Sequence, residues 1–180
     1  MSLRISGNRL IQTLPGDETR PTTSKVREAI FNIWQGTIEG CQWLDLCTGS
    51  GAMGAEALCH GAGRVVGIEQ NPKACAIALA NWKKVAQSEQ QISIVRGNVI
   101  QKLATLSGQQ FDRIYFDPPY QGGLYDGVLA AIVKYDLLSR QGELAAEHLP
   151  GMAIACDGLV ITREKKYGNT AITFLSRSSN

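Results

Sequence analysis

The sequence predicts an α/β fold whose core is a doubly wound, mostly parallel sheet. From residue 41 onward, short apolar runs alternate with segments that carry apolar residues at helical spacing, the pattern of parallel strands joined by crossover helices. A glycine-rich stretch follows the first run, where such sheets turn sharply from strand to helix. The chain ends in two strand-like runs around a Gly-Asn pair, which predicts an antiparallel C-terminal hairpin.

An N-terminal extension precedes this pattern. Residues 3–14 predict two short strands around a Gly-Asn turn, and residues 24–34 predict a helix because their apolar side chains recur at helical spacing. Thr22 or Thr23 is placed to cap the start of that helix. We therefore expect a small β-hairpin and helix within residues 1–35.

The catalytic core is expected in residues 41–178, and core and extension together form a single domain over residues 1–180. No repeat or low-complexity linker suggests a second domain. The expected strands are 41–49, 64–70, 91–97, 111–117, 142–148 and two strands within 158–177, and the expected helices are 51–61, 72–86, 99–106 and 125–135.

Composition and charge narrow the class of protein. Apolar residues make up 44% of the chain and charged residues 19%, as in soluble globular proteins, and no apolar run is long enough for a membrane span. The five cysteines form no CxxC pair, which favours reduced thiols in a cytoplasmic protein and argues against a metal site. The net charge of +2 is uneven: residues 1–30 carry +2, residues 163–180 carry +3 and residues 31–162 carry −3. Basic ends suit a phosphate backbone, although solubilising charge is the simpler explanation.

The glycine-rich stretch "LDLCTGSGAMGAEAL" has Gly49, Gly51 and Gly54 in G-x-G-x-x-G spacing between a strand and a helix. Glycines there let a ligand approach the backbone and the helix N-terminus, although a tight packing turn has the same spacing. Glu69 ends the second core strand, twenty residues after Gly49. A carboxylate at that place can bind both hydroxyls of a ribose, so the sequence predicts a cofactor that contains adenosine.

Two further polar residues bear on which cofactor binds. Asp45 lies four residues before Gly49. Its carboxylate suits the ammonium group of S-adenosyl-L-methionine better than the pyrophosphate of NAD, and an equally good alternative is an Asp that caps the glycine loop. Asn98 ends the third core strand, where it is placed to bond an adenine edge or simply to form a turn.

The stretch "FDPPY" at residues 116–120 predicts the chemistry. An exocyclic amine on a nucleobase must rehybridise before it accepts a methyl group, and two acceptors aimed at its hydrogens favour that geometry. Asp117 supplies a carboxylate, and the carbonyl of Pro118 is held by the fixed φ angles of Pro118 and Pro119. Tyr120 offers a face on which a flipped base can stack. A simple Asp-Pro-Pro turn with a surface tyrosine is the structural alternative.

These motifs resemble a known family. "LDLCTGSGAMGAEAL" together with "FDPPY" resembles the Rossmann-like, class I S-adenosylmethionine-dependent methyltransferases that act on amino nitrogens. The segment "RPTTSKVREAIFNIW" at residues 20–34 is similar to the signature of the RsmD family, whose members methylate the N2 amine of one guanine in 16S ribosomal RNA of the small subunit. The ending "REKKYGNTAITFLSR" is also similar to the final hairpin of that family, so the resemblance covers nearly the whole chain.

The resemblance assigns roles by position. It implies a catalytic loop and a cofactor site in the RsmD pattern, with Arg20 of the RPTT loop near the methionine carboxylate. Lys25 and Arg27 are candidates for phosphate contacts, or else part of a solvated helix face. The implied catalytic residues are Asp117, Pro118, Pro119 and Tyr120; the cofactor residues are Asp45, Gly49, Gly51, Gly54, Glu69, Asn98, Val99, Arg20, Thr22 and Thr23; the RNA-binding residues are Arg4, Arg9, Lys25 and Arg27.

The sequence differs from the RsmD family pattern in places, and other functions stay open. The family usually has Phe and Ala where this chain has Cys47 and Thr48, a change that bears on packing under the cofactor. The partner implied is ribosomal RNA or the small subunit, with no metal or membrane, and the protein is expected to be a monomer. Open alternatives are an N6-adenine or N4-cytosine methyltransferase on DNA or other RNA, an NAD-binding oxidoreductase, and a catalytically idle RNA-binding factor.

Overall fold

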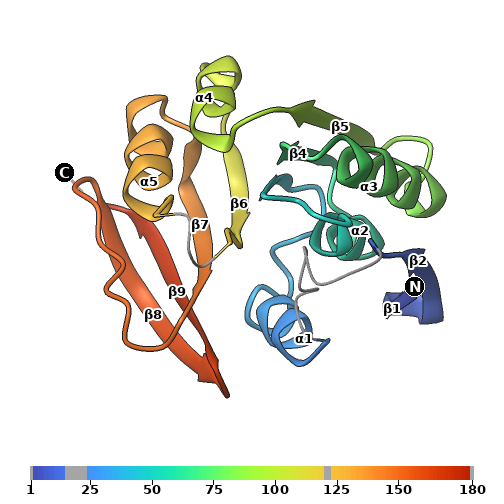
Figure 1. The fold of residues 1–180 in the computed structure, drawn as a ribbon, viewed down its shortest axis with the longest axis horizontal. Coiled ribbons are helices and arrows are strands. Elements are labelled where there is room, and N and C mark those ends of the chain that lie inside the picture. The colour runs from blue at the N-terminus through green and yellow to red at the C-terminus, as the bar shows by residue number, and fades with distance from the viewer. Residues whose placement is uncertain (1, 15–23, 120–122, 179–180) are drawn as a thin grey trace.

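A computed structural model describes residues 2–14, 24–119 and 123–178, and it contains a seven-stranded sheet with helices on both faces (Figure 1). A separate two-stranded hairpin lies at the N-terminus. The strands are β1 (Ser2–Ile5), β2 (Arg9–Gln12), β3 (Gln42–Leu46), β4 (Arg64–Glu69), β5 (Gln91–Arg96), β6 (Phe111–Phe116), β7 (Leu138–His148), β8 (Leu159–Tyr167) and β9 (Thr170–Arg177). The helices are η1 (Ser6–Asn8), α1 (Ser24–Ile33), α2 (Ala52–Cys59), α3 (Pro72–Val85), α4 (Val99–Leu103), η2 (Ala104–Leu106) and α5 (Tyr125–Lys134).

The large sheet has the order β5-β4-β3-β6-β7-β9-β8. The strands from β5 to β7 are parallel, whereas β9 is antiparallel to both β7 and β8. The chain therefore leaves β3 in one direction, through β4 and β5, and returns to the other side of β3 with β6. Ligands of doubly wound sheets bind at this reversal, outside the carboxyl ends of the strands. The reversal predicts a site beyond the ends of β3 and β6.

Two apolar cores lie on the two faces of the sheet. One contains residues of α1, α2 and α3, with Trp34 set edge-on to both Trp43 and Phe174 at ring-centroid distances of 5.4 and 5.8 Å. The other lies under α4 and α5 and includes Val99 and Leu129. Because both faces are covered, the central strands are apolar on both sides, which explains why they appear as continuous apolar runs in the sequence.

Strand β7 is longer than the sequence predicts. It begins at Leu138, where residues 142–148 were expected. Its first part contains Ser139, Arg140 and Gln141, which carry no apolar alternation. The register against β6 also shifts between Phe111 and Arg113, so the early part of the strand leaves no regular signal in the sequence.

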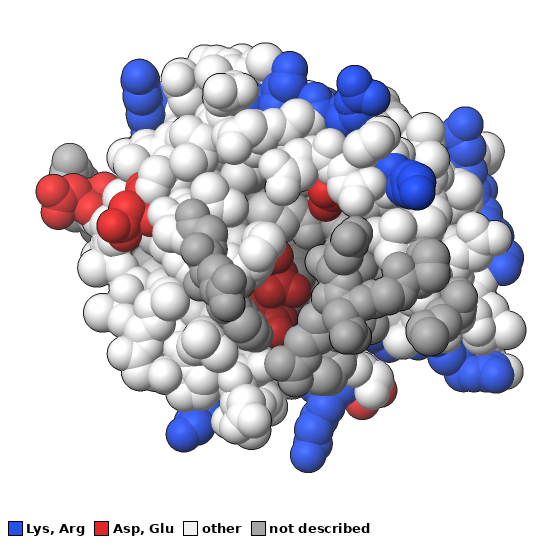
Figure 2. Space-filling view, viewed as in Figure 1, with Lys and Arg blue, Asp and Glu red and all other residues white. Residues whose placement is uncertain are grey.

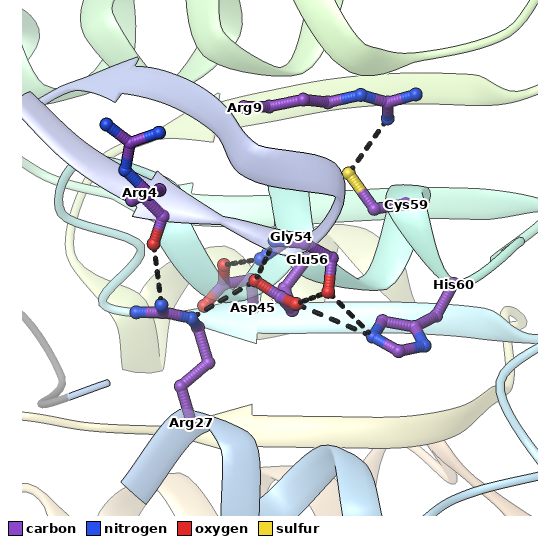
Figure 3. Close-up of polar contacts among 9 residues, drawn as sticks. Arg4, Arg9, Arg27, Asp45, Gly54, Glu56, Cys59 and His60 are labelled. Carbon is purple, nitrogen blue, oxygen red and sulfur yellow. Dashed lines mark hydrogen bonds and ion pairs between the residues drawn. The ribbon is translucent and has the colours of Figure 1, made fainter. Parts of the chain in front are cut away.

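A buried ion pair joins the N-terminal hairpin to the core. Arg27 of α1 donates from Nε to Glu56 of α2 at 3.1 Å and from Nη2 to the carbonyl of Arg4 at 2.8 Å (Figure 3). The side chains of Arg27 and Glu56 are only 4% and 8% exposed. The hydroxyl and backbone N–H of Ser6 also donate to Glu56. One carboxylate thus ties η1, α1 and α2 together.

A buried amide makes a second connection. Asn81 of α3 accepts from the backbone N–H of Gln12 at 2.9 Å and donates to the carbonyls of Gln12 and Ser50, each at 2.8 Å. The end of β2 is therefore bonded to the same side chain as the glycine-rich loop. Within the described ranges, no helix is both long and apolar enough to cross a membrane.

Candidate active site

Three acidic residues lie near one another at the carboxyl ends of β3, β4 and β6. Asp45 is in β3, Glu69 ends β4, and Asp117 directly follows β6. The three carboxylates are close enough to Cys47 to influence the pKa of its thiol. Burial is the largest cause that raises this pKa, and the negative charges of Glu69, Asp117 and Asp45 raise it further. Acidic side chains lie at the bottom of a hollow at the centre of the face in Figure 2. The predicted site therefore has an acidic floor.

Asp45 is buried, with 2% of its surface exposed, and its Oδ2 accepts from the backbone N–H of Gly54 at 3.0 Å. Burial raises its pKa well above the ordinary value for an aspartate, the hydrogen bond from Gly54 opposes that rise, and the charge of Glu69 adds to it. The capping role considered for Asp45 is therefore present. Its Oδ1 makes no hydrogen bond to a described residue, so a cationic ligand would relieve the cost of burying this carboxylate.

Glu69 is held in a fixed orientation by two backbone donors. Its Oε2 accepts from the N–H of Gly49 at 2.9 Å, and its Oε1 accepts from the N–H of Asn71 at 2.8 Å. Each carboxylate oxygen retains acceptor capacity beyond one hydrogen bond. Glu69 is thus positioned to accept two hydroxyl donors without a change of rotamer, as the ribose interpretation requires.

The three glycines have different roles. Gly49 has a φ of +56° and directs its N–H to Glu69. Gly51 and Gly54 pack against α3: the indole N–H of Trp82 donates to the carbonyl of Gly51 at 2.8 Å, and a Cβ on Gly54 would lie 2.4 Å from the Trp82 ring. Two of the glycines thus let α2 approach α3 closely, which is the packing role considered for this motif.

Gly54→Ala is expected to destabilise the protein by roughly 1–3 kcal/mol, because the added methyl group overlaps the buried Trp82 ring. Gly127→Ala is the matched control, since Gly127 is also helical and its Cβ would meet only the flexible end of Ile100. That variant should be neutral or more stable by up to about 1 kcal/mol. Urea denaturation measures both, and equal stabilities of the two variants would contradict the packing role.

The two predicted cofactor residues that follow β5, the third core strand, have structural roles in the protein itself. Asn98 is exposed, and its Oδ1 caps α4 by accepting from the N–H of Gln101 at 3.3 Å. Val99 is buried in the core under α4 and α5. Asn98 therefore has the turn role considered for it, and its contact with an adenine edge stays a prediction, as does the part of Val99 in the cofactor site.

The catalytic loop is described only in part. The N–H of Asp117 faces the carbonyl of Leu46 at 3.5 Å, so the loop starts beside the end of β3. Pro118 is buried and Pro119 is exposed. Tyr120 lies outside the described residues, and so do Arg20, Thr22 and Thr23 of the RPTT segment. The roles of these four residues stay predictions.

The four basic residues expected to bind RNA differ in exposure. Arg4 and Arg9 are exposed on the hairpin, where Arg4 bonds to Asn8 and Arg9 donates to the Cys59 sulfur at 3.1 Å. Lys25 is exposed at the start of α1. Arg27 corrects the sequence interpretation, because it is 3% exposed and is neither on a solvated face nor open to a phosphate. A buried guanidinium needs a carboxylate partner, and Glu56 supplies it.

Sequence reasoning missed Glu147. It follows Ala146, which pairs with Phe116, so Glu147 is level with Asp117 on the neighbouring strand. It is 5% exposed, the hydroxyl of Tyr115 donates to its Oε2 at 2.5 Å, and the hydroxyl of Tyr125 donates to its carbonyl at 2.7 Å. The available signal was an acid at the carboxyl end of a parallel strand, the criterion that selected Asp45 and Glu69.

No group of three or more His, Cys, Asp or Glu side chains that could hold a metal ion occurs within residues 2–14, 24–119 and 123–178. The cysteines of the chain are free thiols. Burial is the largest cause of the raised pKa at each of Cys41, Cys47, Cys59, Cys75 and Cys156.

The parallel sheet with an antiparallel end, together with the acids at its reversal point, defines a Rossmann-like methyltransferase fold of class I and confirms the predicted fold class. The Conserved hypothetical protein 95 family matches residues 4–176, and the chain belongs to this family.

Relatives and solved structures agree with this assignment. "Putative rRNA methyltransferase YlbH" of Bacillus subtilis (strain 168) is 31% identical in an alignment that covers 96% of this chain and 97% of that protein. "Ribosomal RNA small subunit methyltransferase D" of Buchnera aphidicola subsp. Baizongia pistaciae is 30% identical over 90% of this chain and 85% of its own length. The solved structure "Putative methyltransferase yhhF from Escherichia coli" is 27% identical, with a TM-score of 0.85 over all of both chains. These findings confirm the resemblance to the RsmD family.

Proposed function

We propose that the protein methylates the exocyclic N2 amine of a guanine in 16S ribosomal RNA, with S-adenosylmethionine as the methyl donor. The observation that carries this function is the meeting of Asp45, Glu69 and Asp117 at the reversal point of the sheet, in a family whose relatives include ribosomal RNA small subunit methyltransferases. The choice of guanine and of its N2 atom rests on the RsmD resemblance.

The residues present fit the cofactor. Asp45 is a buried carboxylate whose raised pKa shows the cost of its burial without a cationic partner, so it would bind the ammonium group of the methionine moiety. Glu69 would bind the ribose hydroxyls, with Gly49 holding its rotamer. When bound, the cofactor supplies an electrophilic methyl group on a sulfonium. Asn98 and the RPTT residues Arg20, Thr22 and Thr23 complete the proposed cofactor site.

The catalytic loop orients the amine. The Asp117 carboxylate and the Pro118 carbonyl would accept hydrogen bonds from the two N–H groups of the guanine N2 amine, an arrangement that draws the nitrogen lone pair out of conjugation with the ring. Burial of Pro118 and the fixed φ angles of both prolines hold that carbonyl in place. The amine loses its proton readily once it is alkylated, so Asp117 acts by orientation and charge and need not be a strong base. Pro119 stiffens the loop, and Tyr120 would stack on the base.

The function is tested by incubating the protein with radiolabelled S-adenosylmethionine and small ribosomal subunits that lack the modification. Label should enter the 16S RNA, and mass spectrometry of digested RNA should place it on the N2 atom of one guanine. Label on an adenine or cytosine would show that the enzyme methylates one of the alternative bases and not guanine. Cofactor binding by calorimetry without any label transfer to RNA would reject the proposal.

Asp45→Asn is expected to stabilise the protein while weakening cofactor binding. Because the folded pKa of Asp45 is raised, the protonated carboxyl is favoured in the folded state, and stability is lost as pH rises from the ordinary aspartate pKa through the folded pKa. Asparagine keeps an acceptor for Gly54 without that cost, so its gain in melting temperature should appear at neutral pH and vanish at about pH 3–4. Thermal melts across pH with parallel calorimetry measure both effects, and a variant that binds the cofactor normally would contradict the ammonium role.

The protein would act in the cytoplasm as a monomer, on ribosomal RNA or the small subunit, without a metal. Residues 1–35 would cover the site and grip RNA through Arg4, Arg9 and Lys25, and residues 41–178 would form the catalytic core of the same domain. Analytical ultracentrifugation tests the oligomeric state, and the mass of a single chain is the expected result.

A further inference from the structure

We propose that three basic residues of β8, namely Arg163, Lys165 and Lys166, bind the phosphate backbone of the substrate RNA beside the target nucleotide. We name them the β8 basic strip. The inference rests on the proposed function for the presence of RNA, and it adds a surface at the far side of the sheet from the N-terminal hairpin. It is carried by position, exposure and charge.

Strand pairing places the strip near the catalytic edge of the sheet. Lys165 pairs with Ile172 of β9, and Ile172 pairs with Glu147 of β7. Glu147 in turn is level with Asp117. The carboxyl end of β8 therefore lies at the same height as the catalytic loop, three strands away from β6, which corresponds to about 14 Å at normal strand spacing. This separation suits phosphates that flank a flipped base better than the target nucleotide itself.

The strip is exposed along its length. Strand β8 is the last strand of the sheet, and every residue from Val160 to Lys166 is exposed. The guanidinium of Arg163 lies 5.7 Å from the centre of the buried Phe174 ring, which limits its freedom. Lys165 and Lys166 form no hydrogen bond or ion pair within the described part of the chain. These cations are therefore available to a ligand from solution.

Charge and position separate the strip from the rest of the hairpin. Glu164 is the only acid between Arg163 and Tyr167, so the catalytic half of β8 is net positive. Arg177, by contrast, pairs with Leu159 at the opposite end of the hairpin and bonds to Asp136 at 2.6 Å. The excess of positive charge at the C-terminal end of the sequence is thus concentrated at the catalytic edge. Arg163 and Lys165 lie on one face of β8 and Lys166 lies on the other. A phosphate backbone that crosses this edge strand can contact exposed cations on both faces, whereas an apolar partner would leave them unpaired.

The test compares two double variants of equal charge. Lys165→Gln with Lys166→Gln removes two cations of the strip. Lys83→Gln with Lys134→Gln removes two exposed cations from the last turns of α3 and α5. These turns lie near the amino ends of the parallel strands, away from the catalytic loop. Methyl transfer to unmodified small subunits is measured over a range of salt concentrations, with S-adenosylhomocysteine affinity and thermal stability as checks on the fold.

For the strip variant we expect the KM for subunits to rise roughly tenfold, kcat and S-adenosylhomocysteine affinity to stay near wild type, and the slope of log affinity against log salt to fall by about 2. The control variant should match wild type. Lysines on an edge strand also prevent sheet-to-sheet association, so self-association of the strip variant with unchanged KM and salt slope would overturn the inference. If the wild-type protein transfers no methyl group, the proposed function fails instead.

Discussion

Asp117→Ala is expected to lower methyl transfer by about 100- to 1,000-fold, the loss typical when one preorganised polar contact to the reacting group is removed. Affinity for S-adenosylmethionine should remain within a few-fold of wild type, because the proposed ammonium and ribose contacts belong to Asp45 and Glu69. The loop itself should persist, since its prolines are unchanged. Single-turnover label transfer and calorimetry measure the two quantities separately.

Two further variants sharpen this experiment. Asp117→Asn keeps an acceptor oxygen but loses the negative charge, so its rate should lie between those of wild type and the alanine variant. Asp157→Ala removes an exposed acid outside the site and should be as active as wild type. If Asp117→Ala retains full activity while binding the cofactor, the carboxylate does not orient the amine.

The second large effect is on stability. Glu56→Ala is expected to lower the free energy of unfolding by about 3–5 kcal/mol, because it leaves the buried Arg27 guanidinium without its carboxylate. The Nη1 atom of Arg27 is already buried without a hydrogen-bond partner in the described structure, so the remaining contact with the Arg4 carbonyl cannot compensate. Urea denaturation provides the measurement.

The matched control is Glu28→Ala, which removes an exposed acid from α1 and should change stability by at most about 0.5 kcal/mol. The double variant Arg27→Met with Glu56→Leu removes both charges and should recover much of the lost stability. An equal loss in the single and double variants would show that packing around Glu56, and not the ion pair, stabilises the hairpin.

The sheet and its helices were largely predictable because their signals are local. Apolar runs that alternate with segments of helical spacing predicted the strands and crossover helices, and α3 begins at Pro72, the first residue of the expected helix 72–86. The polar start of β7 was missed since residues 139–142 carry no apolar pattern and lie at an irregularity in the pairing with β6, between Leu138 and Glu143. Local propensity says little about such tertiary pairing.

The site divides in the same way. Asp45, Glu69 and Asp117 were found because each stands at the end of a recognisable strand. Arg27 was misassigned since its partner Glu56 is 29 residues away on another helix, and helical spacing alone did not show which face is buried. Glu147 was missed although it lies at the end of a predicted strand, because its partner Tyr115 is 32 residues away on another strand. Long-range polar pairing is set by tertiary packing, which residue spacing does not encode.

The amide of Asn81 has a consequence for how the parts of the protein respond to one another. Because one side chain is bonded to Gln12 of the hairpin and to Ser50 of the glycine loop, motion of either segment disturbs the other. A ligand that ordered the loop through this side chain would also order the end of the hairpin. Any coupling free energy carried in this way is reciprocal, so a ligand of the hairpin would change cofactor affinity by the same factor that the cofactor changes its affinity.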